Sequence, residues 1–140
     1  MEVTFPDGTV VRAEGLLRRD ENAAWRTFGL YLDQRWRPTW PATVVDWEDF
    51  GLPICSTEAA QAIRDSFARA RNGERVEIGC AGGLGRTGTT LACMAVLSGV
   101  PPHDAVSWVR SHYQPSAIET IEQESWVRWF AANQFGTVRQ

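Results

Sequence analysis

A thiol and a guanidinium are separated by five residues in a glycine-rich stretch near the middle of the chain. Cys80 comes first and Arg86 second, and three of the five residues between them are glycine. A β-prone run at residues 75–78 precedes the stretch, and an apolar, helix-prone run at residues 91–97 follows it. In such a strand–loop–helix unit, the loop N–H groups and the positive end of the helix dipole point at one centre. The stretch therefore predicts a loop that binds phosphate or sulfate around a nucleophile.

This arrangement suits the transfer of a phosphoryl group to sulfur. A cysteine attacks phosphorus as the thiolate, and N–H donors, a helix N-terminus and a guanidinium all stabilise that anion. Arg86 can hold two phosphoryl oxygens at once, and the Thr87 hydroxyl can donate to the sulfur when it leaves. Glycine at most loop positions keeps side chains out of the anion site. The predicted phosphate-binding residues are Ala81, Gly82, Gly83, Leu84, Gly85 and Arg86.

Two other phosphate-binding loops fit the stretch less well. A Walker A loop needs a lysine, and the chain contains none. The dinucleotide-binding pattern GxGxxG is present as Gly83, Gly85 and Gly88. That pattern also requires a second strand that ends in an acidic residue about 20 residues further on. Asp104 instead follows two prolines at the start of an expected helix, so the match to a dinucleotide site is weak.

Residues 79–88, GCAGGLGRTG, resemble the signature HCxxGxGR[ST]G of the cysteine-dependent protein tyrosine phosphatase superfamily. Rhodanese-like and arsenate-reductase proteins use similar loops, but the glycines and the threonine of this stretch favour the phosphatases. The resemblance covers roughly residues 43–130. It implies an α/β fold with a central mixed β-sheet flanked by helices and the phosphate loop between a central strand and a helix. Gly79 replaces the signature histidine, which helps to activate the family's nucleophile, so the resemblance also implies slower turnover.

The reaction also needs an acid, because a phosphate ester leaves more easily when its bridging oxygen is protonated. Residues 46–53, DWEDFGLP, resemble the family's WPDxGxP loop, which makes Asp49 the general acid. Glu48 replaces the usual proline of that loop, which affects its rigidity and its closing motion. Asp46 and Glu48 are rival acids.

Residues 113–120 and Gln123 resemble the family's last loop and helix start, whose glutamine positions the hydrolytic water. The resemblance implies that no metal or organic cofactor is required. It also allows a reversible disulfide between Cys55 and Cys80 under oxidation, as in some relatives. The predicted catalytic residues are Cys80, Arg86, Asp49, Thr87 and Gln123.

Secondary-structure signals place the loop in an α/β sandwich. Strands come early and helices late, with strand–helix alternation around the loop, so the loop should lie at the carboxyl end of a central strand. Ser56 or Thr57 is the expected helix cap, and residues 16–24 fit a loop or a short helix. The other expected elements are a hairpin over 3–12, strands at 27–32 and 42–47, and helices over 56–72, 101–112 and 120–133.

The composition fits one globular domain over residues 1–140, with 44 % apolar residues. A net charge of −3 argues against nucleic-acid binding, which depends on clustered basic residues. Three widely spaced cysteines without a CxxC pair fit neither a disulfide framework nor a zinc site. No apolar run approaches the roughly 18 residues that span a bilayer, and no signal-peptide pattern is present. We therefore expect no membrane span and a cytoplasmic location.

The sequence thus predicts a small phosphomonoester hydrolase that forms a covalent cysteinyl-phosphate. The resemblance implies that its substrate is phosphotyrosine in a protein or peptide, with dual specificity as an open alternative. Two further alternatives remain: a phosphate-binding module without catalysis, and an enzyme for phosphoinositides or other non-protein phosphoesters.

Overall fold

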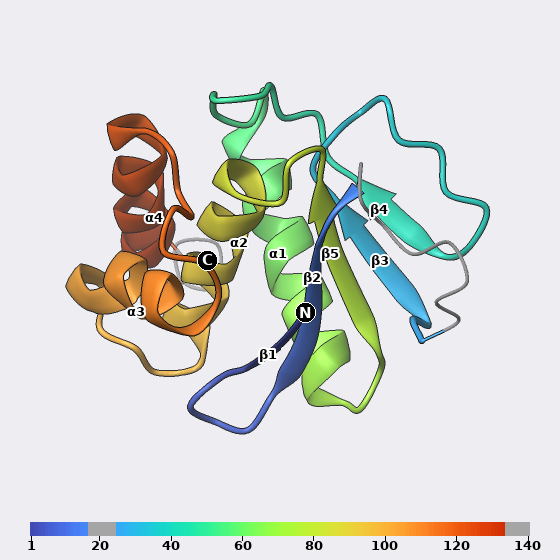
Figure 1. Cartoon of the computed structure of the whole chain (residues 1–140), viewed down its shortest axis with the longest axis horizontal. Helices are drawn as coiled ribbons and strands as arrows, with labels where there is room; N and C mark the ends of the chain where they lie inside the picture. The colour runs from blue at the N-terminus through green and yellow to red at the C-terminus, as the bar shows by residue number, and fades with distance from the viewer. Residues whose placement is uncertain (17–24, 134–140) are drawn as a thin grey trace, which may run out of the picture.

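A computed structural model of the chain describes residues 1–16 and 25–133 (Figure 1). Its five-stranded sheet has the order β1-β2-β5-β3-β4. Among the paired strands that the structure describes, the edge pair β1 (Glu2–Thr4) and β2 (Val10–Gly15) is the antiparallel one. Strands β2, β5 (Val76–Cys80), β3 (Phe28–Tyr31) and β4 (Ala42–Val44) run parallel. This mixed sheet with flanking helices confirms the predicted fold class.

The predicted hairpin forms at residues 2–15 and depends on a short turn. The Asp7 carboxylate accepts a hydrogen bond from the Thr9 N–H at 3.0 Å, and Gly8 has a φ of +89°, which glycine adopts without strain. The hairpin places β2 beside the central strand β5, so Gly15 is paired with Cys80. Residues 17–24, which include most of the segment expected as a loop or short helix, lie outside the described residues.

The central strand β5 is buried along its whole length and leads directly into the phosphate loop. It extends to Cys80, two residues beyond the predicted strand end at residue 78. Because the loop leaves the carboxyl end of this strand, it lies at the edge where parallel sheets place their ligand sites. Helix α2 (Gly85–Leu97) follows the loop and is buried from Gly85 to Val96.

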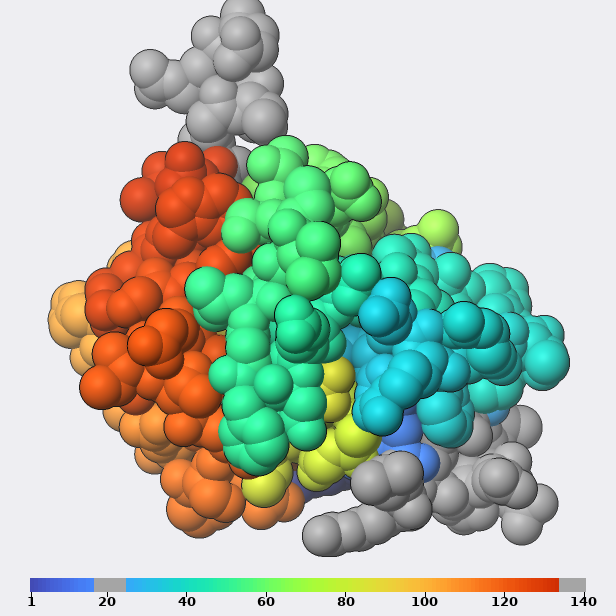
Figure 2. Space-filling model, turned by 90° about the horizontal axis from the view of Figure 1, so that it is seen from above, coloured from blue at the N-terminus to red at the C-terminus, as the bar shows by residue number. Residues whose placement is uncertain are grey.

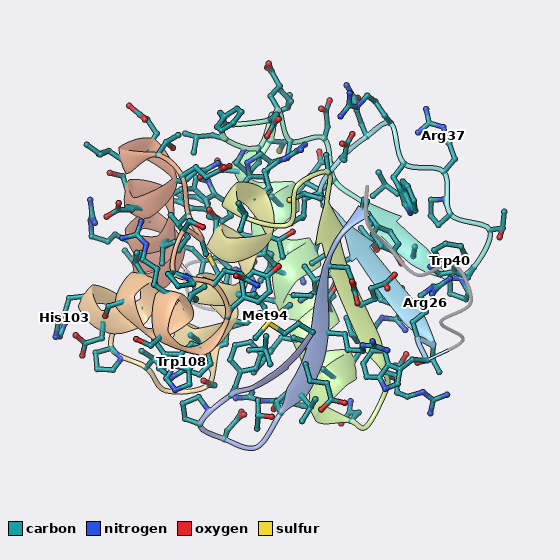
Figure 3. All side chains as sticks on the ribbon, viewed as in Figure 1. Arg26, Arg37, Trp40, Met94, His103 and Trp108 are labelled. Atoms are coloured by element: carbon teal, nitrogen blue, oxygen red, sulfur yellow. The ribbon has the colours of Figure 1, made fainter. Side chains whose placement is uncertain are left out.

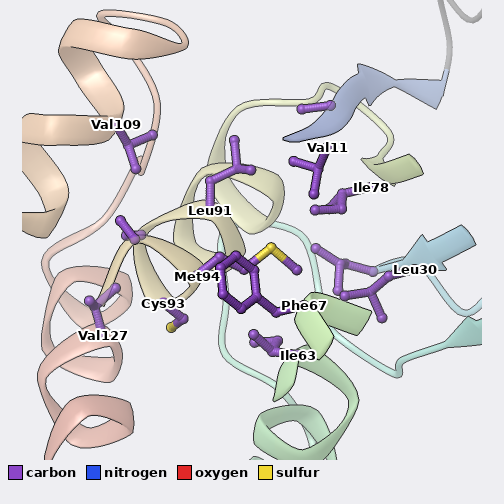
Figure 4. Close-up of a cluster of buried hydrophobic side chains, with 14 of the residues drawn as sticks. Val11, Leu30, Ile63, Phe67, Ile78, Leu91, Cys93, Met94, Val109 and Val127 are labelled. Atoms are coloured by element: carbon purple, nitrogen blue, oxygen red, sulfur yellow. The ribbon is translucent and has the colours of Figure 1, made fainter. Parts of the chain in front are cut away.

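The helices form two layers on one face of the sheet (Figure 1). Helices α1 (Ser56–Arg71) and α2 pack on the sheet, and α3 (Ala105–His112) and α4 (Ile121–Asn133) pack against α2. A short 3-10 helix, Pro102–Asp104, precedes α3. Enclosure by sheet and helices explains why nearly every residue of α2 is buried. Figure 4 shows its Leu91 and Met94 beside Phe67 of α1 and Ile78 of β5.

The opposite face of the sheet carries a buried polar cluster. Tyr31 and Glu77 project there, and the Tyr31 hydroxyl donates to Glu77 Oε1 at 2.5 Å. The Trp40 indole donates to the same hydroxyl at 2.8 Å, and the Arg26 guanidinium lies 3.7 Å from the Trp40 ring (Figure 3). The connection between β3 and β4 therefore covers this face.

Two local predictions are wrong, for identifiable reasons. The strand expected at residues 42–47 ends at Val44, because Trp47 pairs instead with Pro53 in an isolated antiparallel bridge that closes the acid loop. Cys55, rather than Ser56 or Thr57, is the N-cap of α1, and no side chain of the described residues caps the start of that helix. The Ser56 hydroxyl instead accepts a hydrogen bond from the Trp126 indole at 2.9 Å. Within the described residues, no helix is both long and apolar enough to cross a membrane.

Candidate active site

The predicted nucleophile and its hydroxyl partner lie within hydrogen-bonding distance. Cys80 is the last residue of β5 and is 2 % exposed. Thr87, in the first turn of α2, is fully buried and donates its hydroxyl to Cys80 Sγ at 2.9 Å. The tight turn at Gly83, whose φ is +75°, brings the strand end and the helix start together. A hydroxyl in this position stabilises negative charge on the sulfur.

Arg86 has one nitrogen of its guanidinium hydrogen-bonded to the fold and another edge that, within the described residues, makes no hydrogen bond. Its Nη1 donates to the carbonyl of Leu32 at 3.0 Å and to that of Trp47 at 2.9 Å. Within the described part of the chain, its Nε and Nη2 have no hydrogen-bond partner, although the side chain is only 2 % exposed. Nε and Nη2 together form the edge that binds two oxygens of a phosphate. The fold thus orients Arg86 and leaves this edge available.

Two carboxylates flank the Arg86 guanidinium. Asp33 Oδ2 lies 3.7 Å from Nη1, and Asp49 Oδ1 lies 3.5 Å from Nη2. Asp33 follows the end of β3, is buried, and accepts two hydrogen bonds from the Arg35 guanidinium, at 3.0 and 2.8 Å. These hydrogen bonds lower the pKa of Asp33 below its ordinary value. Asp33 was not predicted, although its position after an expected strand was a usable signal.

The acid loop, residues 46–53, reaches over the same guanidinium. Its Trp47 indole donates to the Gly51 carbonyl at 2.8 Å, which ties the loop across its base. Phe50 has a φ of +58°, and its N–H donates to Asp49 Oδ1 at 3.1 Å. Asp46 and Glu48 are exposed like Asp49, but among the described residues only Asp49 of these three lies within ion-pair distance of Arg86. Figure 2 shows this loop, in teal and green, between α4 and the segment at residues 33–41.

Gln123 lies in the first turns of α4 and bridges three parts of the site. Its side chain is fully buried, its Nε2 donates to the Gly51 carbonyl at 3.2 Å, and its Oε1 accepts from the Glu119 N–H at 2.9 Å. A Cβ added at Gly85 would lie 3.2 Å from the Gln123 amide. Gln123 therefore contacts the acid loop and borders the phosphate loop. Its predicted role in placing water stays a prediction.

The carboxylate of Glu119 lies near the site, although the sequence predicted no role for this residue. A Cβ at Gly85 would overlap Glu119 Oε1, so this carboxylate lies against the start of α2. Partial burial raises the pKa of Glu119, and the neighbouring Asp49 carboxylate raises it further. Glu119 belongs to the segment compared with the family's last loop, but nothing in its spacing indicated contact with Gly85. It is a second acid to test beside Asp49.

Comparisons with known proteins agree with this geometry. Residues 50–139 match the family model described as Swiss Army Knife protein, DSP-PTPase phosphatase domain, or PTP-SAK. The match spans well over half of the chain and includes the phosphate loop. The chain belongs to the PTP-SAK family. The predicted membership of the cysteine-dependent phosphatase superfamily is thereby confirmed.

Two relatives of this PTP-SAK domain are uncharacterized proteins of Methanocaldococcus jannaschii. MJECL20 is 37 % identical over 107 residues, which cover 69 % of this chain and 70 % of the relative. MJ0215 is 36 % identical over 107 residues, which cover 69 % of this chain and 65 % of the relative. The chain therefore spans about two thirds of the length of these relatives.

Solved structures share the fold of this PTP-SAK domain at low sequence identity. A mutant form of Tk-PTP gives a TM-score of 0.73 at 23 % identity, covering 94 % of this chain and 95 % of that one. Human DUSP28 gives a TM-score of 0.75 at 12 % identity, covering 98 % of this chain and 99 % of that one. Tk-PTP in the active form gives a TM-score of 0.66 at 24 % identity, covering 77 % of this chain and 79 % of that one. At these identities the likeness establishes the fold alone.

The space beside Gly79, where the superfamily signature has histidine, is filled by another side chain. A Cβ at Gly79 would lie 2.6 Å from Leu16 Cδ2 and 3.3 Å from the Glu14 carbonyl oxygen. Leu16 is 6 % exposed and is held at the end of β2. Gly79 therefore does not leave an empty space where the signature histidine would lie. Leu16 packs against β5 at that position.

Gly79→His should consequently destabilise this PTP-SAK domain. Forcing a side chain into space that Leu16 occupies is expected to lower the free energy of unfolding by about 1–3 kcal/mol. Urea titration of Gly79→His beside wild type measures the loss. The double variant Gly79→His/Leu16→Ala supplies room and should recover part of it. Wild-type stability in the single variant would contradict the packing argument.

The other two cysteines, Cys55 and Cys93, lie outside the phosphate loop and have different environments. Among the described residues all three cysteines are free. Cys93 is fully buried in α2, and burial raises the pKa of its thiol. Cys55 is exposed at the start of α1. Its disulfide with Cys80 under oxidation stays a prediction.

Proposed function

We propose that this domain hydrolyses phosphomonoesters through a cysteinyl-phosphate at Cys80, with phosphotyrosine in proteins or peptides as the substrate. The observation that carries the proposal is the free edge of Arg86. Nε and Nη2 of this buried guanidinium donate no hydrogen bond within the described residues, although Asp49 Oδ1 lies 3.5 Å from Nη2, and two oxygens of a phosphate would satisfy both donors. The Thr87–Cys80 hydrogen bond supports a nucleophilic role for the adjacent sulfur.

In the first step, the Cys80 thiolate attacks phosphorus. The S–P bond forms and the ester P–O bond breaks, while Asp49 transfers a proton to the leaving oxygen. Arg86 and the N–H groups of loop residues 81–85 bind the equatorial oxygens, whose charge must be stabilised in the transition state. The short distance between Asp49 and Arg86 supports this division of roles, because both groups then face the same phosphoryl group.

In the second step, water attacks the phosphorus of the cysteinyl-phosphate. The O–P bond forms and the S–P bond breaks, and Asp49, now a carboxylate, accepts the proton of the water. Thr87 donates its hydroxyl hydrogen bond to the departing thiolate. Gln123, which borders both the acid loop and the start of α2, orients the water. The cycle returns Cys80 and Asp49 to their starting protonation states.

Phosphotyrosine is favoured over smaller esters by an exposed aromatic side chain in the acid loop. Phe50 is 61 % exposed and directly follows Asp49 in the acid loop. An exposed aromatic ring beside the proton donor provides a contact surface for a phenyl ester. Serine and threonine phosphates offer no ring for this contact.

A substrate panel tests the proposal. Peptides with phosphotyrosine or phosphoserine and a phosphoinositide are each incubated with the wild type, and phosphate release is measured. We expect kcat/KM to be highest for the phosphotyrosine peptide, and Phe50→Ala to reduce that preference. Preference for the lipid would overturn the substrate assignment. Binding of phosphotyrosine peptide without any turnover would instead indicate a phosphate-binding module.

Asp49→Asn should lower kcat for a phosphotyrosine peptide by about a hundredfold or more, with a small change in KM. The asparagine keeps the shape of the side chain but has no proton to transfer to the leaving phenol. The defect should shrink for 4-nitrophenyl phosphate, because its leaving group departs without protonation. Glu119→Gln is the matched control, as it neutralises the other nearby carboxylate. A larger defect in Glu119→Gln would move the role of general acid to Glu119.

A further inference from the structure

A buried tyrosine holds the phosphate loop from outside the anion site. Tyr113 follows α3, is 8 % exposed, and donates its hydroxyl to the Gly83 carbonyl at 2.5 Å. The two residues are 30 positions apart in the chain. The contact therefore depends on how α3 packs against α2, and it joins the end of α3 to the middle of the phosphate loop.

Other contacts fix the same turn of the loop. A Cβ at Gly83 would lie 2.7 Å from the backbone nitrogen of Gly15, so the turn presses against the end of β2. The next carbonyl, that of Leu84, accepts hydrogen bonds from the N–H groups of Ile118 at 3.1 Å and Gly88 at 2.9 Å. Two consecutive loop carbonyls are thus held by groups from outside the loop or from the following helix.

Holding these carbonyls determines where the neighbouring N–H groups point. In a planar trans peptide, the carbonyl of Gly83 and the N–H of Leu84 point in opposite directions. If Tyr113 fixes the carbonyl away from the anion site, the Leu84 N–H is directed toward it. Among the described residues, no hydrogen-bond acceptor is assigned to the N–H groups of residues 81–84. These donors are therefore available to an anion.

We propose that Tyr113 is a positioning residue that keeps the phosphate loop in its anion-binding conformation through the Gly83 carbonyl. Without its hydroxyl, the peptide between Gly83 and Leu84 can rotate and place a carbonyl where an N–H donor is needed. Position 79 holds no side chain that could brace the loop, because Leu16 fills that space. The inference builds on the proposed function but concerns binding of the anion, which is measurable without turnover.

The test is Tyr113→Phe, which removes one oxygen atom and keeps the ring. We expect the Kd for inorganic phosphate, measured by calorimetry, to rise about tenfold, because an N–H donor to the anion is lost. The pH midpoint of Cys80 alkylation by iodoacetamide should shift to higher pH, because the loop donors also stabilise the thiolate. For an active wild type, kcat/KM should fall by a similar factor.

Tyr31→Phe is the matched control. Tyr31 is the other tyrosine of the chain, is fully buried, and also donates its hydroxyl at 2.5 Å, but to Glu77 on the far face of the sheet. This variant should lower the melting temperature while phosphate affinity and the alkylation midpoint stay at wild-type values. Equal shifts in both variants would indicate general loosening and overturn the proposal.

The remaining outcomes separate this inference from the proposed function. If Tyr113→Phe binds phosphate as tightly as the wild type and Cys80 is alkylated with the same pH midpoint, the role of Tyr113 is overturned. This holds whether or not the wild type turns over substrate. A wild type that binds phosphate but releases none, together with weaker binding in Tyr113→Phe, would support Tyr113 and overturn the catalytic proposal. A wild type that binds no phosphate would overturn both.

Discussion

Cys80→Ser should abolish the release of phosphate from aryl phosphates, with a loss in kcat of about four orders of magnitude or more. The serine hydroxyl stays protonated near neutral pH, and the Thr87 hydroxyl that contacts this position is a donor, not a base. Phosphate release from 4-nitrophenyl phosphate measures the loss. Trapping of radioactive phosphate on the wild type, but not on the variant, after acid quenching would identify the covalent intermediate.

Cys55→Ser is the matched control for the first prediction. Cys55 is an exposed free thiol, so its replacement removes a sulfur without disturbing the packed core. Its activity should equal that of the wild type under reducing conditions. Substantial activity in Cys80→Ser would show that Cys80 is not the nucleophile. Equal losses in both variants would point to a general effect of thiol removal.

Arg86→Lys should lower kcat/KM by about a thousandfold, although the charge is retained. A lysine offers one nitrogen, whereas Arg86 uses Nη1 to hold the Leu32 and Trp47 carbonyls and keeps Nε and Nη2 for the anion. The ammonium group cannot serve both tasks at once. Steady-state kinetics with a phosphotyrosine peptide measure the loss, and calorimetry with inorganic phosphate shows how much of it arises in binding.

Thermal unfolding distinguishes lost chemistry from lost structure in Arg86→Lys. The buried arginine anchors the end of β3 and the acid loop, so a moderate decrease in melting temperature is expected. Arg35→Lys is the control, since Arg35 is an exposed arginine that contacts Asp33 near the same guanidinium. Its kcat/KM should stay within a few-fold of the wild type. A loss below tenfold in Arg86→Lys would contradict the bidentate role of Arg86.

The phosphate loop could be predicted from sequence because its determinants are local. Strand end, glycine turn and helix start are contiguous, and the Thr87–Cys80 contact spans seven residues. The acid loop was located by its spacing of tryptophan, glycine and proline, although the strand before it was placed too long. The sequence alone could not show which carboxylate of this loop lies nearest to Arg86. The ion pair between Asp49 and Arg86 forms because the loop folds back over α2.

The residues that were missed all act through tertiary contacts. Tyr113 reaches Gly83 across 30 residues, and Asp33 reaches Arg86 of α2 from the loop after β3. The predicted cap at Ser56 failed for the same reason, because the Trp126 indole, 70 residues away, uses that hydroxyl. Local patterns predict which side chains can make such bonds. They do not predict which distant partner is brought within reach.

The contact between Leu16 and Gly79 has a consequence for how this sequence can change over time. With Leu16 in place, the signature histidine at position 79 costs stability, and a smaller residue at position 16 lowers that cost. The two positions are therefore expected to be epistatic, and the order of substitutions matters. A chain that carries this pair must keep its phosphate loop in place by other means, and Tyr113 provides one that can evolve independently.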